Sequence, residues 1–194
     1  MGMAEKEGVM LSAKEAIRKL EEGNKRYLSE KTGSGDISPA IRLRTCRDGQ
    51  HPFAIIIACS DSRVIPESIF SVGIGDLFVI RLAGNVIDDH QLGSIEYAVE
   101  HLGTNLVLVL GHTGCGAVEA AIHHDPSGFI KYITDEIQLA IGDETDPYRA
   151  SCLNVEHSIK QISHALDIDH LRHGNDPAVV GAIYHIDDGH VEFL

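Results

Sequence analysis

Two short segments of the sequence carry side chains that bind soft metal ions. Cys59 follows an apolar run at residues 53–58, and His112 and Cys115 follow a second apolar run at residues 106–110. Thiolates and imidazoles are preferred ligands of zinc, and a site with three protein ligands keeps its fourth position open for water. Structural zinc usually has four protein ligands, so this set favours a catalytic zinc site.

Asp61 and Arg63 stand two and four residues after Cys59. If the preceding strand continues, these three side chains point to the same side. A guanidinium can bind a carboxylate through two parallel hydrogen bonds, so we expect Arg63 to keep Asp61 ionised and turned away from the metal. The carboxylate could then accept a hydrogen bond from zinc-bound water. The alternative for this pair is an ordinary surface ion pair.

The composition is that of an ordinary globular protein. The chain has 194 residues, of which 43% are hydrophobic and 23% charged, which suffices for one well-filled domain. Its net charge of −13 argues against nucleic acid or an anionic membrane as partners. We see no secretory signal and no apolar run of membrane-spanning length. The four cysteines do not suggest a disulfide framework, so we expect a cytoplasmic protein.

Continuous apolar runs alternate with amphipathic segments along the chain. The patterns predict strands at 53–58, 77–81 and 105–110, helices at 91–101, 117–124, 128–141 and 147–166, and a hairpin at 178–193 with an Asp-Gly turn. Apolar strands joined by helices predict an α/β fold with a mostly parallel central sheet, helices on both faces and a C-terminal antiparallel hairpin. The metal-binding segments would then lie at the carboxyl ends of neighbouring strands, where functional groups gather.

The N-terminal region differs in character from the rest of the chain. Ser12 and Glu15 fit a capping box that begins an amphipathic helix extending to about Tyr27. The polar stretch after this helix predicts a linker. We therefore expect residues 1–40 to form a helical arm and linker within a single domain, 1–194, and the helix could pack on another subunit.

The two-part metal motif resembles that of the β-class carbonic anhydrases. The matching residues are Cys59-Ser60-Asp61-Ser62-Arg63 and His112-x-x-Cys115, and the likeness extends through 75–81, 83–85, 95–99 and 180–184 to cover roughly residues 12–194. The resemblance implies that Cys59, His112 and Cys115 bind Zn²⁺ and that Asp61 and Arg63 orient the nucleophile. It further implies reversible hydration of carbon dioxide to bicarbonate by zinc-bound hydroxide, and a homodimer or larger homo-oligomer.

The resemblance is to the plant-type members, which keep the zinc position open. It implies that Gln50, Phe78, Ala83 and Tyr97 line the substrate pocket, with the Gln50 amide donating to a substrate oxygen. Ala83 replaces a larger aliphatic residue, which would make the pocket roomier. For Phe78 and Tyr97 the alternative is a plain core role, and for Gln50 it is an ordinary loop position.

Other functions stay open at this point. The same zinc site could hydrolyse carbon disulfide or carbonyl sulfide, which are also linear and apolar. A zinc-binding protein without turnover is a further alternative. A phosphate-binding turn built on Gly111, Gly114 and Gly116 lacks the dinucleotide spacing. A Cys115–His112 hydrolase lacks a third residue to orient the histidine.

Overall fold

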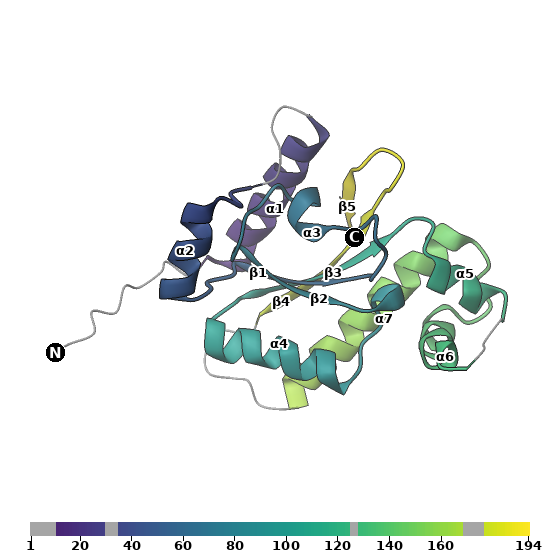
Figure 1. Ribbon diagram of the computed structural model, residues 1–194. Coiled ribbons are helices and arrows are strands. Elements are labelled where there is room, and N and C mark those ends of the chain that lie inside the picture. Colours follow the sequence, from purple (N-terminus) through teal and green to yellow (C-terminus); the bar gives the residue numbers. More distant parts are fainter. Residues whose placement is uncertain (1–10, 30–34, 125–127, 169–176) are drawn as a thin grey trace.

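Figure 1 shows the computed structural model of the protein, which describes residues 11–29, 35–124, 128–168 and 177–194. Its centre is a five-stranded sheet in the order β2-β1-β3-β4-β5. The strands are β1 (Ala54–Ala58), β2 (Leu77–Arg81), β3 (Leu106–His112), β4 (Ala178–Tyr184) and β5 (Val191–Phe193). The first four are parallel, and β5 pairs antiparallel with β4. The predicted α/β fold is confirmed.

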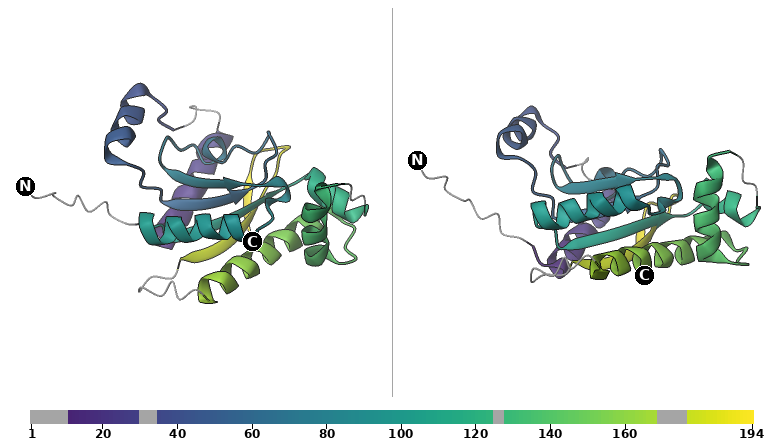
Figure 2. Two further views of the ribbon diagram at one scale, coloured as in Figure 1. Left: turned by 60° about the horizontal axis from the view of Figure 1, so that its bottom comes forward. Right: turned by 90° about the horizontal axis from the view of Figure 1, so that it is seen from below.

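Helices cover both faces of this sheet, as Figure 2 shows from two sides. The helices are α1 (Ala13–Leu28), α2 (Pro39–Asp48), α3 (Pro66–Ile69), α4 (Asp89–Leu102), α5 (Gly116–Ile122), α6 (Ile130–Ile141) and α7 (Pro147–Ile168), with a 3-10 turn η1 (Ala83–Asn85) after β2. α1 and α3 pack on one face, whereas α4 and α7 pack on the other.

Strand β1 shows why the apolar runs are continuous. Side chains alternate between the two faces of a strand, so Ile56 faces α1 and α3 while Ile55 and Ile57 face α4 and α7. All three isoleucines are almost fully buried. A strand covered on both faces has no solvent-facing positions, and therefore no polar alternation in its sequence.

Local end signals account for the bounds of two helices. Ser12 and Glu15 form the predicted capping box at the start of α1. Asp88 and Gln91 form a second capping box at the start of α4, and Gly103 ends that helix in the left-handed conformation. In each case side-chain or glycine geometry satisfies backbone groups that the helix leaves unpaired.

The structure departs from the predicted elements most clearly in three places. The region assigned to a linker ends at Ser38, which caps helix α2, and Pro39 occupies the first turn of that helix. Residues 30–34 of the predicted linker lie outside the described residues. The short helix α3 was not predicted, because four residues are too few for a periodic pattern. Strand β3 continues to His112, two residues beyond its predicted end.

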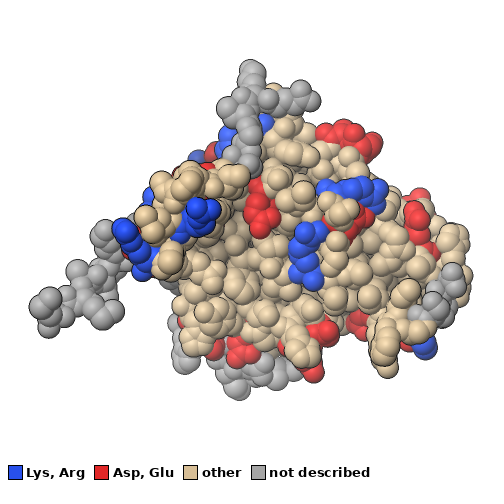
Figure 3. Space-filling view, viewed as in Figure 1, with Lys and Arg blue, Asp and Glu red and all other residues tan. Residues whose placement is uncertain are grey.

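Charged residues are unevenly distributed over the face shown in Figure 1. Figure 3 shows basic side chains gathered over α2 and a broad central area without charged side chains, which acidic side chains border from below. Among the described residues, no helix combines the length and apolar character required to cross a bilayer.

Helix α1 lies unusually close to the chain at the end of α3. Gly23 is buried, and a Cβ atom added there would overlap the carbonyl oxygen of Phe70. The neighbouring Asn24 donates to the carbonyl oxygens of Ile69 (3.2 Å) and Gly189 (3.0 Å) and accepts from the N–H of Val191 (3.0 Å). One turn of α1 therefore joins α3 to the C-terminal hairpin.

We expect Gly23→Ala to lower the free energy of unfolding by about 1–3 kcal/mol, because the added methyl group overpacks this contact. Urea unfolding followed by circular dichroism measures the change. Glu21→Ala is the matched control, since Glu21 is exposed on the same helix. The control should be neutral or slightly more stable, from helix propensity alone. Equal stabilities of the two variants would contradict the close approach.

Candidate metal centre

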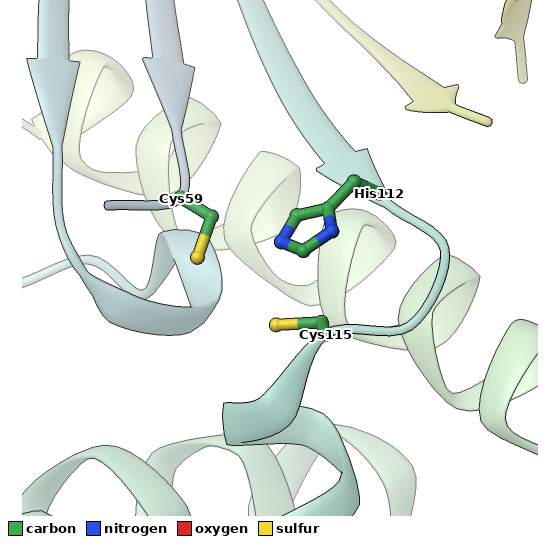
Figure 4. A group of neighbouring side chains, drawn as sticks. All are labelled: Cys59, His112 and Cys115. Carbon is green, nitrogen blue, oxygen red and sulfur yellow. The ribbon is translucent and has the colours of Figure 1, made fainter. Parts of the chain in front are cut away.

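Cys59, His112 and Cys115 meet at one edge of the sheet. β1 and β3 are neighbouring parallel strands, with Ala58 opposite Leu110. Cys59 follows the end of β1, His112 is the last residue of β3, and Cys115 is the N-cap of α5. All three residues are buried, and one ligand atom from each lies within 4.8 Å of the others. Figure 4 shows the two sulfur atoms and the imidazole ring directed at a common space.

The histidine is oriented for binding an ion. Nδ1 of His112 lies 2.9 Å from the carbonyl oxygen of Thr113, which is a hydrogen-bond acceptor only. The proton is therefore on Nδ1, and the lone pair is on Nε2. That Nε2 atom is buried and has no hydrogen-bond partner in the described part of the chain. A buried acceptor without a partner is costly unless something binds it, and a metal ion fits this requirement.

The sulfur atoms have the electrostatic environment of metal ligands. Sγ of Cys59 lies 3.4 Å from the N–H of Asp61 and 3.3 Å from the N–H of Gly84. The hydrogen bond with Cys115 lowers the pKa of Cys59 and raises that of Cys115, because the two sulfurs share one proton. Metal binding releases such a proton, since thiolates are the ligating form. The donor set of two sulfurs and one imidazole nitrogen suits zinc.

The N–H of Gly84 can approach Sγ of Cys59 because residue 84 adopts a left-handed backbone conformation and has no Cβ atom. Its φ is +66°, and a Cβ there would lie 2.7 Å from Cδ1 of Ile137. Asn154 on α7 donates to the carbonyl oxygen of Gly84 at 2.7 Å and is itself buried. Sequence reasoning assigned no role to either residue. Asn154 does not stand out in the sequence, because α7 contains many other polar residues.

Asp61 and Arg63 form the predicted two-pronged contact. Nε of Arg63 donates to Oδ1 of Asp61 at 2.9 Å, and Nη2 donates to Oδ2 at 2.7 Å. The hydrogen bond from Arg63 holds the pKa of Asp61 well below its ordinary value. Among the described residues, the group of close ligand atoms consists of the two cysteines and the histidine and does not include Asp61. The carboxylate is therefore held beside the group rather than within it.

The reason for this pairing differs from the one predicted. The strand does not continue past Ala58; instead the chain turns, and the backbone N–H of Arg63 also donates to Oδ1 of Asp61 at 2.9 Å. An aspartate that accepts from the backbone two residues later is typical of a turn. Nη2 of Arg63 reaches further to the carbonyl oxygen of Gly114 at 3.1 Å, so it links both metal-binding segments.

A second arginine fixes the backbone of the first segment. Nε of Arg81 donates to the carbonyl oxygen of Cys59 at 3.0 Å, and Nη2 donates to that of Asp61 at 2.7 Å. Arg81 is the last residue of β2, opposite Ala58 in the neighbouring strand. Sequence reasoning missed this residue, because nothing in a single sequence distinguishes it from a solvated arginine at a strand end.

The four predicted pocket residues do not come together within one chain. Ala83 lies at the metal centre, next to Gly84. Phe78 and Tyr97 contact each other, with ring centroids 6.2 Å apart. However, Phe78 pairs with Ile55 near the start of β1, four residues before Cys59.

Gln50 lies near the amino-terminal ends of the strands, whereas the metal centre of its own chain lies at their carboxyl ends. It is exposed and precedes β1, whereas Cys59 follows β1. A strand of five residues spans roughly 16 Å at about 3.3 Å per residue. Its neighbours Gly49 and His51 line a cavity with Asp76, which precedes β2. Within one chain, Gln50 is therefore too far from the sulfur atoms to contact a substrate there.

Comparison with known proteins identifies the family. A family model described as carbonic anhydrase matches residues 54–191, which include all three close ligand residues. The chain belongs to the carbonic anhydrase family. The expectation that the protein is an enzyme of this family is confirmed.

Individual relatives support the same family and its β class. The carbonic anhydrase of Mycolicibacterium smegmatis is 35% identical over 192 residues, covering 91% of this chain and 91% of the relative. Carbonic anhydrase 2 of Mycobacterium tuberculosis is 36% identical over 185 residues, covering 90% and 89%. A structure of tetrameric β-carbonic anhydrases from Sordaria macrospora matches with a TM-score of 0.67 at 26% identity, covering 80% of this chain and 87% of that chain.

The two-pronged contact of this carbonic anhydrase can be tested by removing the guanidinium. In Arg63→Ala with zinc added, we expect the Asp61 carboxylate to leave its position and turn toward the cysteine and histidine ligands, because only the backbone N–H of residue 63 then restrains its side chain. Crystal structures of the variant and the wild type at the same neutral pH measure this. Arg18→Ala, which removes only an exposed pair with Glu22, should leave Asp61 in place. An unmoved Asp61 in Arg63→Ala would contradict the restraint.

Proposed function

We propose that this protein is a zinc-dependent enzyme that hydrates carbon dioxide reversibly to bicarbonate and a proton. The observation that carries the proposal is the buried group of Cys59, His112 and Cys115 with Asp61 held beside it by Arg63. The group offers three ligands and not four, as in catalytic zinc sites. Carbonic anhydrases that cover about nine tenths of this chain support the reaction.

The three close residues would hold the zinc ion through two sulfurs and Nε2 of His112. When bound, zinc lowers the pKa of water enough to supply a nucleophile near neutral pH. Apolar side chains, including Val86, Val118 and Ile137, surround the two cysteines. They limit the access of bulk water and give carbon dioxide, which is itself apolar, a compatible environment.

Asp61 is suited to orient the attacking water. An ionised carboxylate has about four lone-pair sites, two on each oxygen. Oδ1 of Asp61 accepts from N and Nε of Arg63, and Oδ2 accepts from Nη2 alone. One site on Oδ2 therefore remains for the hydrogen of the water. Because Arg63 keeps the carboxylate ionised, Asp61 acts here as an acceptor and not as an acid.

The substrate pocket is proposed to form between two copies of the chain. Gln50, Phe78 and Tyr97 lie away from the metal centre of their own chain, yet Tyr97 is 47% exposed on α4. The centre of the face in Figure 3, next to α4, is a broad area without charged side chains. The Sordaria relative is described as tetrameric. These observations support a homodimer or larger assembly in which each subunit supplies Gln50, Phe78 and Tyr97 to its partner's pocket.

Two further expectations belong to this proposal. We propose that the chain forms one domain, 1–194, with residues 1–40 as a helical arm and linker. The packing of α1 on the same sheet as α3 supports the single domain. We also propose a cytoplasmic location, since the described cysteines are all free thiols, as a reducing compartment requires.

Metal removal tests the proposed reaction. We expect about one zinc ion per chain, loss of nearly all carbon dioxide hydration after chelation, and recovery when zinc is returned, because the ion supplies the nucleophile. Stopped-flow hydration assays and mass spectrometry of bound metal give the two measurements. Carbon disulfide serves as the control substrate and should not be turned over. A metal-free protein with full activity, or turnover of carbon disulfide without carbon dioxide hydration, would contradict the proposal.

Mixed dimers test the shared pocket. Gln50→Ala and Cys59→Ala chains should each be nearly inactive alone. Co-expressed chains that pair randomly with two-fold symmetry should recover roughly a quarter of wild-type activity, because one site of each mixed dimer is then intact.

The matched control is a mixed dimer of a Cys59→Ala chain and a His112→Ala chain. It should recover nothing, since each site takes all its metal ligands from one chain. Absence of recovery with Gln50→Ala would show that the glutamine does not serve a partner's site.

A further inference from the structure

The C-terminal hairpin carries a second group of metal-binding side chains. His185, His190 and Glu192 each offer one ligand atom, and these atoms lie within 4.8 Å of one another. None of the three belongs to the metal centre described above. The group also differs in chemistry, because it contains two imidazoles and a carboxylate but no sulfur.

The pairing of β4 with β5 explains why these three side chains share one face. The N–H of His185 donates to the carbonyl oxygen of His190 at 2.9 Å, so these residues face each other across the hairpin. Side chains two apart on a strand lie on the same side, which places Glu192 with His190. The spacing His-x₄-His-x-Glu, read across a tight turn, is the sequence signal of this arrangement.

The distances within the group suit a small divalent ion. Nε2 of His185 lies 3.2 Å from Oε2 of Glu192. Two ligands of a tetrahedral zinc ion with bonds of about 2.0–2.1 Å are about 3.3 Å apart. The rings of His185 and His190 are stacked, with centroids 3.9 Å apart and planes inclined by 14°. The side chains are therefore already gathered, and one ring must rotate out of the stack before the in-plane lone pairs of both histidines can point at one ion.

Surrounding residues hold the group in place. The hydroxyl of Tyr148 on α7 donates to Oε2 of Glu192 at 2.7 Å. Oδ1 of Asp188 lies 2.6 Å from Nδ1 of His190, so a second carboxylate stands beside the group. Such outer contacts orient ligands and strengthen metal binding. The side chain of His185 is 18% exposed and that of Glu192 is 49% exposed, so an ion can enter from solvent.

We propose that His185, His190 and Glu192 form a second cation site, which binds a divalent transition-metal ion such as zinc. Imidazole and carboxylate together favour zinc, nickel, cobalt or copper, whereas magnesium and calcium prefer all-oxygen sites. The net charge of −13 attracts cations in general.

An ion here would restrain the end of β4, which contacts the segment that carries His112 and Thr113. Tyr184, the residue before His185, pairs with His112 in the sheet. The N–H of Ile186 donates to Oγ1 of Thr113 at 3.0 Å. Fixing His185 to His190 and Glu192 therefore restrains the backbone that contacts the residue after His112.

Zinc binding to the full-length protein tests this site. Protein with its sulfur site already loaded is dialysed against buffered free Zn²⁺ from nanomolar to millimolar, and bound zinc is counted by mass spectrometry. We expect the wild type to bind a second zinc ion. Glu192→Gln and His190→Ala should bind it about 10-fold more weakly or worse, and both should keep the first. Mg²⁺ in place of Zn²⁺ should leave the second site empty.

Two matched controls separate this site from the sulfur site. His90→Ala removes an exposed histidine with a weak contact to Asp88 at 3.5 Å and should bind both ions. Cys115→Ala should lose the first ion and keep the second. A wild type that binds one ion, or a Glu192→Gln variant with wild-type affinity, would overturn the proposal. The glutamine variant preserves the side chain's size, so it decides the question even if His190→Ala fails to fold.

Discussion

The contact between the guanidinium of Arg63 and the carboxylate of Asp61 determines what the metal centre can do. A carboxylate next to two thiolates and an imidazole is a natural fourth ligand, and it would close the site. Arg63 occupies most of its lone pairs and also binds the carbonyl oxygen of Gly114. In the proposed enzyme, this one side chain would keep the fourth zinc position open. It also connects the two loops that carry Cys59, His112 and Cys115.

Much of the fold and of the ligand set was predictable because short-range signals determine them. Apolar runs without polar alternation indicate buried parallel strands, and ligands placed just after such runs must meet at one edge of the sheet. Cys59, His112 and Cys115 can therefore be grouped from their positions in the sequence alone. The capping box of Ser12 and Glu15 fixed the start of α1 in the same way.

The remaining parts depend on contacts that are distant in sequence. Asn154 supports Gly84 across 70 residues, and Arg81 holds the backbone of Cys59 from a neighbouring strand. Neither contact leaves a local pattern. The pairing of Asp61 with Arg63 was predicted, but the turn that brings them together was not. The sequence of residues 59–63 does not show whether the strand continues past Ala58 or the chain turns there. Gln50 was assigned a role whose geometry requires a second chain.

The amide of Asn24 has a consequence for how the molecule is made. It bonds to Gly189 and Val191, across 165 and 167 residues of sequence. During synthesis, α1 emerges early and exposes the apolar stripe around Leu20, which is fully covered only in the finished protein. Contacts of such long sequence separation form slowly. The nascent chain therefore carries the apolar stripe of α1 without its hairpin contacts until residues 189–191 have been synthesised.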